Sequence, residues 1–180
     1  MRTLAKIISF FALLKYRIFY SKRIKIGKNV IANFRLKISG PGKIEIEDNV
    51  NLWSFAEKTS LLTYSSKAFI RIGNGCRING ATLQARKEIT VGKKCLLGST
   101  IIMDNDFHHV DPQRRFDKSD IPTKPVKIGN NVWLCGQSAV LKGVTIGDNS
   151  VVAFRALVTK AVPENSIVAG NPAQILPKGL

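Results

Sequence analysis

The chain has 180 residues, a length typical of one domain, and its 44% of hydrophobic residues exclude an intrinsically disordered protein. Its 28 basic and 12 acidic residues give a formal net charge of +16, which predicts attraction to nucleic acid, anionic lipid, acidic glycans or phosphorylated cofactors. Eleven of the basic residues and no acidic residue lie in residues 1–43, so most of the excess charge belongs to the first quarter of the chain.

The first predicted element is a basic amphipathic helix over residues 2–20, within an N-terminal segment 1–22. No run of 18 uncharged apolar residues occurs, which excludes a membrane-spanning helix; the nearest approach is Ile7–Leu14, between Lys6 and Lys15. Two interpretations remain open. The helix packs on the domain or on a neighbouring subunit, or it makes a peripheral contact with an anionic membrane.

A six-residue repeat governs residues 23–180. The phrase aliphatic-x-Ile/Val-Gly begins at Ile24, Ile70, Ile89, Val126 and Val144. Aliphatic residues follow one another at intervals of six in two longer series: Ile128, Leu134, Val140, Ile146, Val152 and Val158, and earlier Val91, Leu97 and Met103. This period predicts one short strand and one tight turn for each side of a three-sided coil of 18 residues. We therefore expect a mostly β, parallel solenoid with its aliphatic residues stacked inward.

The three cysteines, Cys76, Cys95 and Cys135, form no CxxC motif. Their spacing excludes a disulfide framework and argues against a zinc site. We expect small, buried side chains at these positions and a reducing, cytoplasmic compartment.

The repeat resembles that of the hexapeptide-repeat acyltransferases, and the resemblance covers residues 24–180. It implies a left-handed parallel β-helix, assembled as a homotrimer with sites between subunits. It also implies acetyl-CoA as the acyl donor, with no metal.

The register breaks once, in residues 104–125, which predicts a loop that leaves the solenoid. This segment holds both histidines of the chain and five of its twelve carboxylates. Imidazole is suited to general-base chemistry near neutral pH, and a carboxylate from Asp104 or Asp106 would orient the ring of His108. The alternative is a pair of solvated loop histidines.

The phrase Asp104–His108 is similar to the catalytic loop of sugar O-acetyltransferases in this family. The resemblance implies that His108 is the base that deprotonates the acceptor hydroxyl. His109 stands where many relatives have proline, which leaves open which of the two histidines acts. Asn79 matches a position near the acceptor sugar, so we expect Asn79 and His109 to contact the acceptor.

The C-terminal region is similar to the family's coenzyme-A-binding signature. The resemblance implies that the following residues lie beside the cofactor: Trp133, Gly136, Ala153, Phe154, Arg155, Thr159, Lys160, Pro172 and Ala173. Lys160 would pair with a phosphate. Relatives often have small residues at 154 and 155, so Phe154 either stacks on the adenine or obstructs it.

The favoured function is transfer of an acetyl group from acetyl-CoA to a sugar hydroxyl, in capsule, O-antigen or exopolysaccharide synthesis, at the inner face of the cytoplasmic membrane or free in the cytoplasm. The alternatives are N-acetylation of an amino sugar or nucleotide sugar, and a solenoid scaffold without catalysis. A γ-type carbonic anhydrase needs three zinc-binding histidines and is excluded by the adjacent pair found here. We expect no nucleic-acid partner, because no recognisable binding motif accompanies the basic residues.

Overall fold

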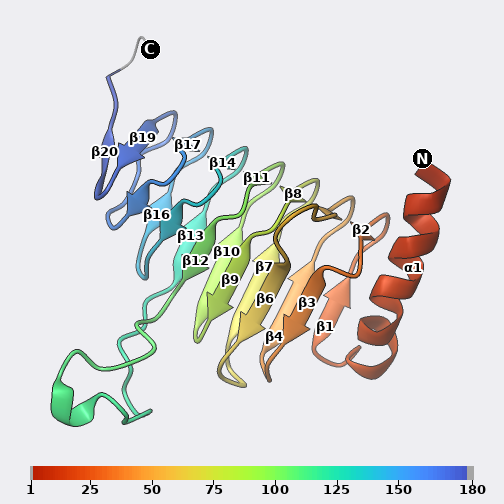
Figure 1. The fold of residues 1–180 in the computed structure, drawn as a ribbon, viewed down its shortest axis with the longest axis horizontal. Helices are drawn as coiled ribbons and strands as arrows, with labels where there is room; N and C mark the ends of the chain where they lie inside the picture. The colour runs from red at the N-terminus through yellow and green to blue at the C-terminus, as the bar shows by residue number, and fades with distance from the viewer. Residues whose placement is uncertain (1, 178–180) are drawn as a thin grey trace.

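The computed structural model describes residues 2–177, so Met1 and residues 178–180, at the outer ends of the two predicted segments, lie outside it. One helix, α1 (Arg2–Phe19), precedes a left-handed parallel β-helix, as the sequence predicts (Figure 1). The solenoid has three parallel sheets, because each coil contributes one short strand to each of its three sides.

The three sheets are named in the order in which a coil passes through them. The first sheet contains β1 (Ile24–Ile26), β4 (Lys43–Ile46), β7 (Phe69–Ile72), β10 (Glu88–Val91), β13 (Val126–Ile128) and β16 (Thr145–Ile146). The second contains β2 (Ile31–Ala32), β5 (Asn51–Leu52), β8 (Arg77–Ile78), β11 (Leu96–Leu97), β14 (Trp133–Leu134), β17 (Val151–Val152), β19 (Ile167–Gly170) and β20 (Ala173–Ile175). The third contains β3 (Leu36–Ser39), β6 (Thr59–Thr63), β9 (Thr82–Ala85), β12 (Ile101–Met103), β15 (Ala139–Val140) and β18 (Leu157–Val158).

The core consists of columns of aliphatic side chains that stack from coil to coil. Ile128 pairs in register with Ile146, and Leu134 with Val152, which confirms the predicted inward series. Cys76 and Cys95 are buried at core positions, also as predicted, whereas Cys135 is only half-buried. Hydrogen bonding to Cys95 and burial together raise the pKa of the Cys76 thiol, which keeps it protonated.

The prediction that Met103 points inward is wrong. Ile102 is the fully buried residue and pairs in register with Leu83 and Val140. The reason is a tighter corner: the N–H of Thr100 donates to the carbonyl of Gly98, so the chain reaches the core one residue sooner.

Where the chain passes from the first sheet to the second, the turn needs a residue with positive φ. Asparagine takes this position in five coils, and tolerates it better than most residues. These residues are Asn29, Asn49, Asn131, Asn149 and Asn165, with φ between 53° and 59°. Their side-chain amides also hydrogen bond along the edge, Asn131 to Asn149 at 3.0 Å and Asn149 to Asn165 at 3.1 Å.

Helix α1 lies across the first coil and binds its backbone. The Oγ of Ser9 accepts a hydrogen bond from the N–H of Ala32 at 3.0 Å, and the hydroxyl of Tyr16 accepts one from the N–H of Ile38 at 3.1 Å. At the other end of the solenoid, β20 pairs antiparallel with β19. Within residues 2–177, no helix has the length and hydropathy that crossing a bilayer requires.

Candidate functional site

The loop 104–125 leaves the third sheet after β12 and returns to the first sheet at β13, so it projects from the edge between these sheets, here called the loop edge (Figure 1). Its neck is closed by an antiparallel bridge between Asn105 and Thr123. The ring of Phe107 packs edge-on against Tyr64, with 5.1 Å between the ring centroids. These contacts fix the position from which the two histidines project.

His108 is exposed, and its Nδ1 lies 2.9 Å from the carbonyl oxygen of Arg115. A carbonyl oxygen only accepts, so Nδ1 carries the proton in this contact. The lone pair of the neutral ring then resides on Nε2. Nε2 has no hydrogen-bond partner among residues 2–177, and it is therefore positioned to take a proton from a bound hydroxyl.

The two aspartates predicted to orient His108 have other partners. The buried carboxylate of Asp104 accepts hydrogen bonds of 2.7 Å from the N–H groups of three successive residues: Arg86, Lys87 and Glu88. Asp106 pairs with Lys142, with 2.7 Å between Oδ1 and Nζ. The prediction of a carboxylate partner for His108 is wrong, because a backbone carbonyl takes that place.

His109 differs from His108 in burial and in tautomer. It is 9% exposed, and its Nε2 lies 2.6 Å from the carbonyl oxygen of Ser119. In this contact Nε2 carries the proton, and the lone pair resides on Nδ1 within a largely buried ring. His109 is therefore suited to holding the loop together.

The turn that carries both carbonyl partners is organised by Asp117, which the sequence analysis did not single out. Its Oδ1 accepts hydrogen bonds from the N–H and the hydroxyl of Ser119 at 2.8 and 2.7 Å, and its Oδ2 pairs with Arg114 at 3.2 Å. The hydrogen bonds from Ser119, with the help of Arg114, lower the pKa of Asp117 to about 2. The phrase Asp-Lys-Ser at 117–119 is a usual signal for such a side-chain-capped turn.

Asn79 lies at a different edge from the histidines. It follows β8, where the chain passes from the second sheet to the third, and its Oδ1 accepts a hydrogen bond from the N–H of Phe55 at 3.0 Å. This edge is here called the Gly136 edge. Within one chain, the third sheet separates Asn79 from His108.

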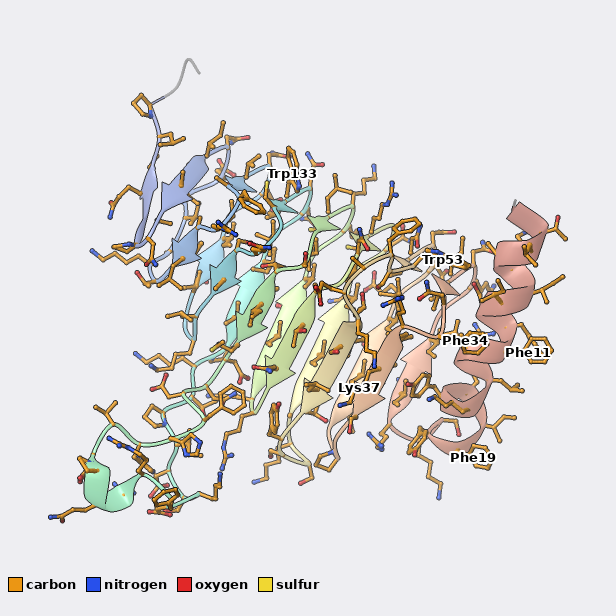
Figure 2. The ribbon with its side chains drawn as sticks, in the orientation of Figure 1. Phe11, Phe19, Phe34, Lys37, Trp53 and Trp133 are labelled. Atoms are coloured by element: carbon orange, nitrogen blue, oxygen red, sulfur yellow. The ribbon has the colours of Figure 1, made fainter. Side chains whose placement is uncertain are left out.

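Most of the predicted cofactor residues gather at the Gly136 edge and on the adjoining second sheet. Trp133 is 49% exposed and points outward from β14, next to Val151 of β17 (Figure 2). Ala153, which is half-buried, follows β17 directly. Gly136 faces the ring of Phe154, which lies 3.5 Å from where a Cβ on the glycine would stand.

Arg155 is held beside that ring. Its guanidinium carbon lies 5.2 Å from the centroid of Phe154, and its Nε donates to the side-chain oxygen of Gln137 at 2.7 Å. The guanidinium therefore remains at the Gly136 edge, where it would meet an anionic group of a ligand.

The other predicted cofactor residues lie elsewhere. Thr159 and Lys160 follow β18 and are exposed at the loop edge, and Lys160 comes 18 residues after Lys142. Pro172 and Ala173 belong to the hairpin of β19 and β20 at the end of the solenoid. One chain thus divides the predicted site between two edges, with the base at one and the aromatic groove at the other. Among the described residues, no cluster of three or more metal-binding side chains occurs.

Comparison with known proteins adds the following findings. The family model for the bacterial transferase hexapeptide (six repeats) matches residues 125–160. A galactoside O-acetyltransferase of Escherichia coli (strain K12) is 29% identical over 164 residues, which are 86% of this chain and 78% of the relative. Several other curated acetyltransferases align over shorter stretches, so that the chain spans about a third to a half of their length.

Two solved structures are similar to a large part of this chain. A hexapeptide-repeat acetyltransferase of Vibrio cholerae O1 biovar eltor, solved in complex with acetyl coenzyme A, is 32% identical and superposes with a TM-score of 0.58 over 69% of each chain. A polysialic acid O-acetyltransferase is 27% identical and superposes with a TM-score of 0.69, covering 85% of this chain and 72% of its own.

Proposed function

The chain belongs to the hexapeptide-repeat acyltransferases and is an acetyl-CoA-dependent O-acetyltransferase, and we propose that it acetylates a sugar hydroxyl with His108 as the general base. The observation that carries this proposal is the contact between Nδ1 of His108 and the carbonyl of Arg115, because it leaves the lone pair of Nε2 directed away from the loop backbone.

In the proposed mechanism, Nε2 of His108 removes the proton of the acceptor hydroxyl as its oxygen attacks. Acetyl-CoA supplies the thioester whose carbonyl carbon is attacked and whose thiol leaves. The C–O bond forms and the C–S bond breaks, and the imidazolium of His108 returns its proton to the departing sulfur. Backbone N–H groups at the groove between coils would hold the oxyanion that forms between these steps.

The Gly136 edge fits the elongated donor. Gly136 has no side chain to fill the space in front of Phe154, so an extended ligand can approach the backbone there. The exposed face of Trp133 offers an apolar wall, and the guanidinium of Arg155 offers a partner for a phosphate. Phe154 packs beside that edge and is available to stack on the adenine.

We further propose that the active enzyme is a homotrimer with its sites between subunits. The division of the site between the loop edge and the Gly136 edge supports this assembly. A neighbouring copy would bring its Gly136 edge to the loop of the first, which places acetyl donor and base in one cleft.

As the acceptor we propose a surface polysaccharide or its precursor, assembled in the cytoplasm. The likeness to a polysialic acid O-acetyltransferase supports a glycan acceptor. The three free cysteines fit a reducing compartment.

The test is thiol release from acetyl-CoA in the presence of a panel of oligosaccharides and amino sugars. His108→Ala should lower kcat by roughly 10²–10⁴-fold, because the reaction loses its general base. His109→Ala is the matched control and should retain more activity than His108→Ala once its folding has been checked by circular dichroism. Equal rates for wild type and His108→Ala would overturn the assignment of the base. Turnover only with amines would replace the hydroxyl acceptor.

A further inference from the structure

The outer face of α1 is apolar and is left uncovered by the solenoid. Six large hydrophobic side chains of the helix are between 52% and 78% exposed: Leu4, Ile7, Phe10, Phe11, Ile18 and Phe19. At 3.6 residues per turn, Leu4, Ile7, Phe11 and Ile18 fall on one stripe along the helix. Figure 2 shows Phe11 and Phe19 on the side of α1 that faces away from the sheets.

The helix cannot turn this stripe inward, because its opposite face is fixed to the first coil. Ser9 and Tyr16 lie two helical turns apart, and both hydrogen bond to the backbone of the coil. Ala12 and Leu13 are buried between them. The rotation of α1 about its axis is thus set by polar contacts, and the apolar stripe is a permanent surface of this chain.

Exposed basic side chains accompany the stripe. Lys6, Arg17, Lys22, Lys25 and Lys28 are all exposed, on the helix or on the coil against which it packs. Residues 1–43 contain no acidic residue, so no carboxylate of this segment compensates these charges. The surface made by α1 and these lysines combines an apolar stripe with a positive margin, and is here called the α1 face.

We propose that the α1 face docks on an anionic lipid bilayer, with α1 lying in the plane of the interface. A lipid surface supplies an apolar layer for the stripe and negative headgroups for the margin. A second copy of the α1 face is the weaker match, because two positive margins would meet without a carboxylate between them. The helix would enter only the headgroup region, which agrees with its being too short and too polar to span a bilayer.

The test is flotation of the purified full-length enzyme with vesicles of phosphatidylcholine alone or mixed with phosphatidylglycerol. Wild-type enzyme should float with the anionic vesicles and remain in solution with the neutral ones. Raising the salt concentration should weaken binding, because charges near the lipid surface are screened.

A matched pair of variants distinguishes binding through the α1 face from non-specific hydrophobic binding to vesicles. Ile18 on α1 and Ile175 at the opposite end of the solenoid are both 57% exposed. Ile18→Glu should weaken binding to anionic vesicles by about tenfold or more, because it removes an inserted side chain and adds a negative charge. Ile175→Glu should bind as wild type does. Circular dichroism is the check that both variants are folded.

A fluorescent variant reports insertion directly. Phe11→Trp should show a blue shift of the added emission on anionic vesicles, measured against the wild-type background of Trp53 and Trp133. The proposal is overturned if wild type stays in solution with anionic vesicles, or if Ile18→Glu floats as well as Ile175→Glu. It is also overturned if Ile18→Glu lowers the oligomeric mass in lipid-free solution, which would assign the α1 face to a second copy. None of these outcomes depends on acetyl transfer.

Discussion

The carboxylate of Asp104 shows how much a single buried side chain contributes at the start of the loop 104–125. It is fully buried and accepts hydrogen bonds from three successive backbone N–H groups, and from the side chain of Asn105 at 3.0 Å. Arg86 and Lys87 form the turn that follows β9 of the preceding coil, and Glu88 begins β10. Asp104 therefore joins two coils at the point where the loop departs.

We predict that Asp104→Asn lowers the free energy of unfolding by about 3 kcal/mol, because an amide removes one of the two acceptor oxygens and faces N–H groups with another donor. The measurement is thermal unfolding at a fixed protein concentration. Asp120→Asn is the control, since Asp120 is exposed in the same loop, and it should unfold as wild type does. An unchanged midpoint for Asp104→Asn, with an altered pH profile of activity, would instead return Asp104 to the catalytic role that the sequence suggested.

The sequence indicated which residues belong to the candidate site, but it did not indicate which groups these residues hydrogen bond to. The positions of His108 and Asp104 follow from the interrupted register, but the hydrogen-bond partners of the two side chains do not. A carboxylate two or four residues before a histidine can equally well cap a neighbouring strand. The backbone carbonyl of Arg115 that binds His108 has no side-chain signature at all, so no pattern of residue types could have indicated it.

At the scale of elements, the loop is a closed unit whose geometry depends on the turn at 114–119. Asp117 holds this turn, and the turn supplies the carbonyls that bind both histidines. The pKa of Asp117 is lowered from its ordinary value of 3.8 to about 2. The carboxylate therefore stays charged and keeps its contacts as the pH falls below 3.8, and it loses them only as the pH approaches 2. A loss of activity at a pH well above 2 would therefore not arise from this turn.

We predict that Asp117→Ala lowers kcat by about tenfold while the KM for acetyl-CoA stays close to that of wild type, because the variant misplaces His108 without touching the Gly136 edge. Asp117→Asn keeps an oxygen that accepts from Ser119 and should restore most of the activity. Steady-state kinetics of the two variants provide the measurement. A KM change without a kcat change would mean that the turn contacts the donor.

The corners of the coils differ in length, so the six-residue repeat does not always predict which residue of a strand points inward. The aliphatic–glycine phrases place the strands of the first sheet correctly, because the asparagine turn that follows them has one length in most coils. The corner after Leu97 is one residue shorter than the corner after Leu134, where Gln137 adds a residue with φ of 57°. A strict period of six therefore assigned Met103 to the core in place of Ile102.

At the scale of the whole molecule, the proposed trimer makes a quantitative prediction. His108→Ala removes the base at the loop edge, and Gly136→Trp blocks the Gly136 edge, so each variant alone should be inactive. Trimers formed by co-expression of the two variants should recover about a quarter of wild-type activity, because each site needs one intact loop and one intact groove drawn at random. Activity that stays at the level of the single variants would place both halves of the site on one chain.

The architecture as a whole was predictable because a six-residue period is incompatible with a helix or a simple sheet. The three-sided parallel coil follows directly from that period, whereas the division of the predicted site between two edges emerges only from the structure. The packing of α1 was not predictable, since an amphipathic helix with two usable faces does not show which of them the solenoid takes. Ser9 and Tyr16 decide it, through bonds to backbone groups that sequence periodicity does not reveal.

The segments that cover the two ends of the solenoid also protect the chain against end-to-end polymerisation. A parallel solenoid presents unpaired backbone groups at its first and last coils, and identical coils would let one copy continue the ladder of the next. Helix α1 occupies the first coil, and the antiparallel strand β20 terminates the second sheet at the last. The hexapeptide repeat itself does not specify how many coils stack on one another. The length of the solenoid is therefore determined by α1 and β20, the two segments that do not follow the repeat.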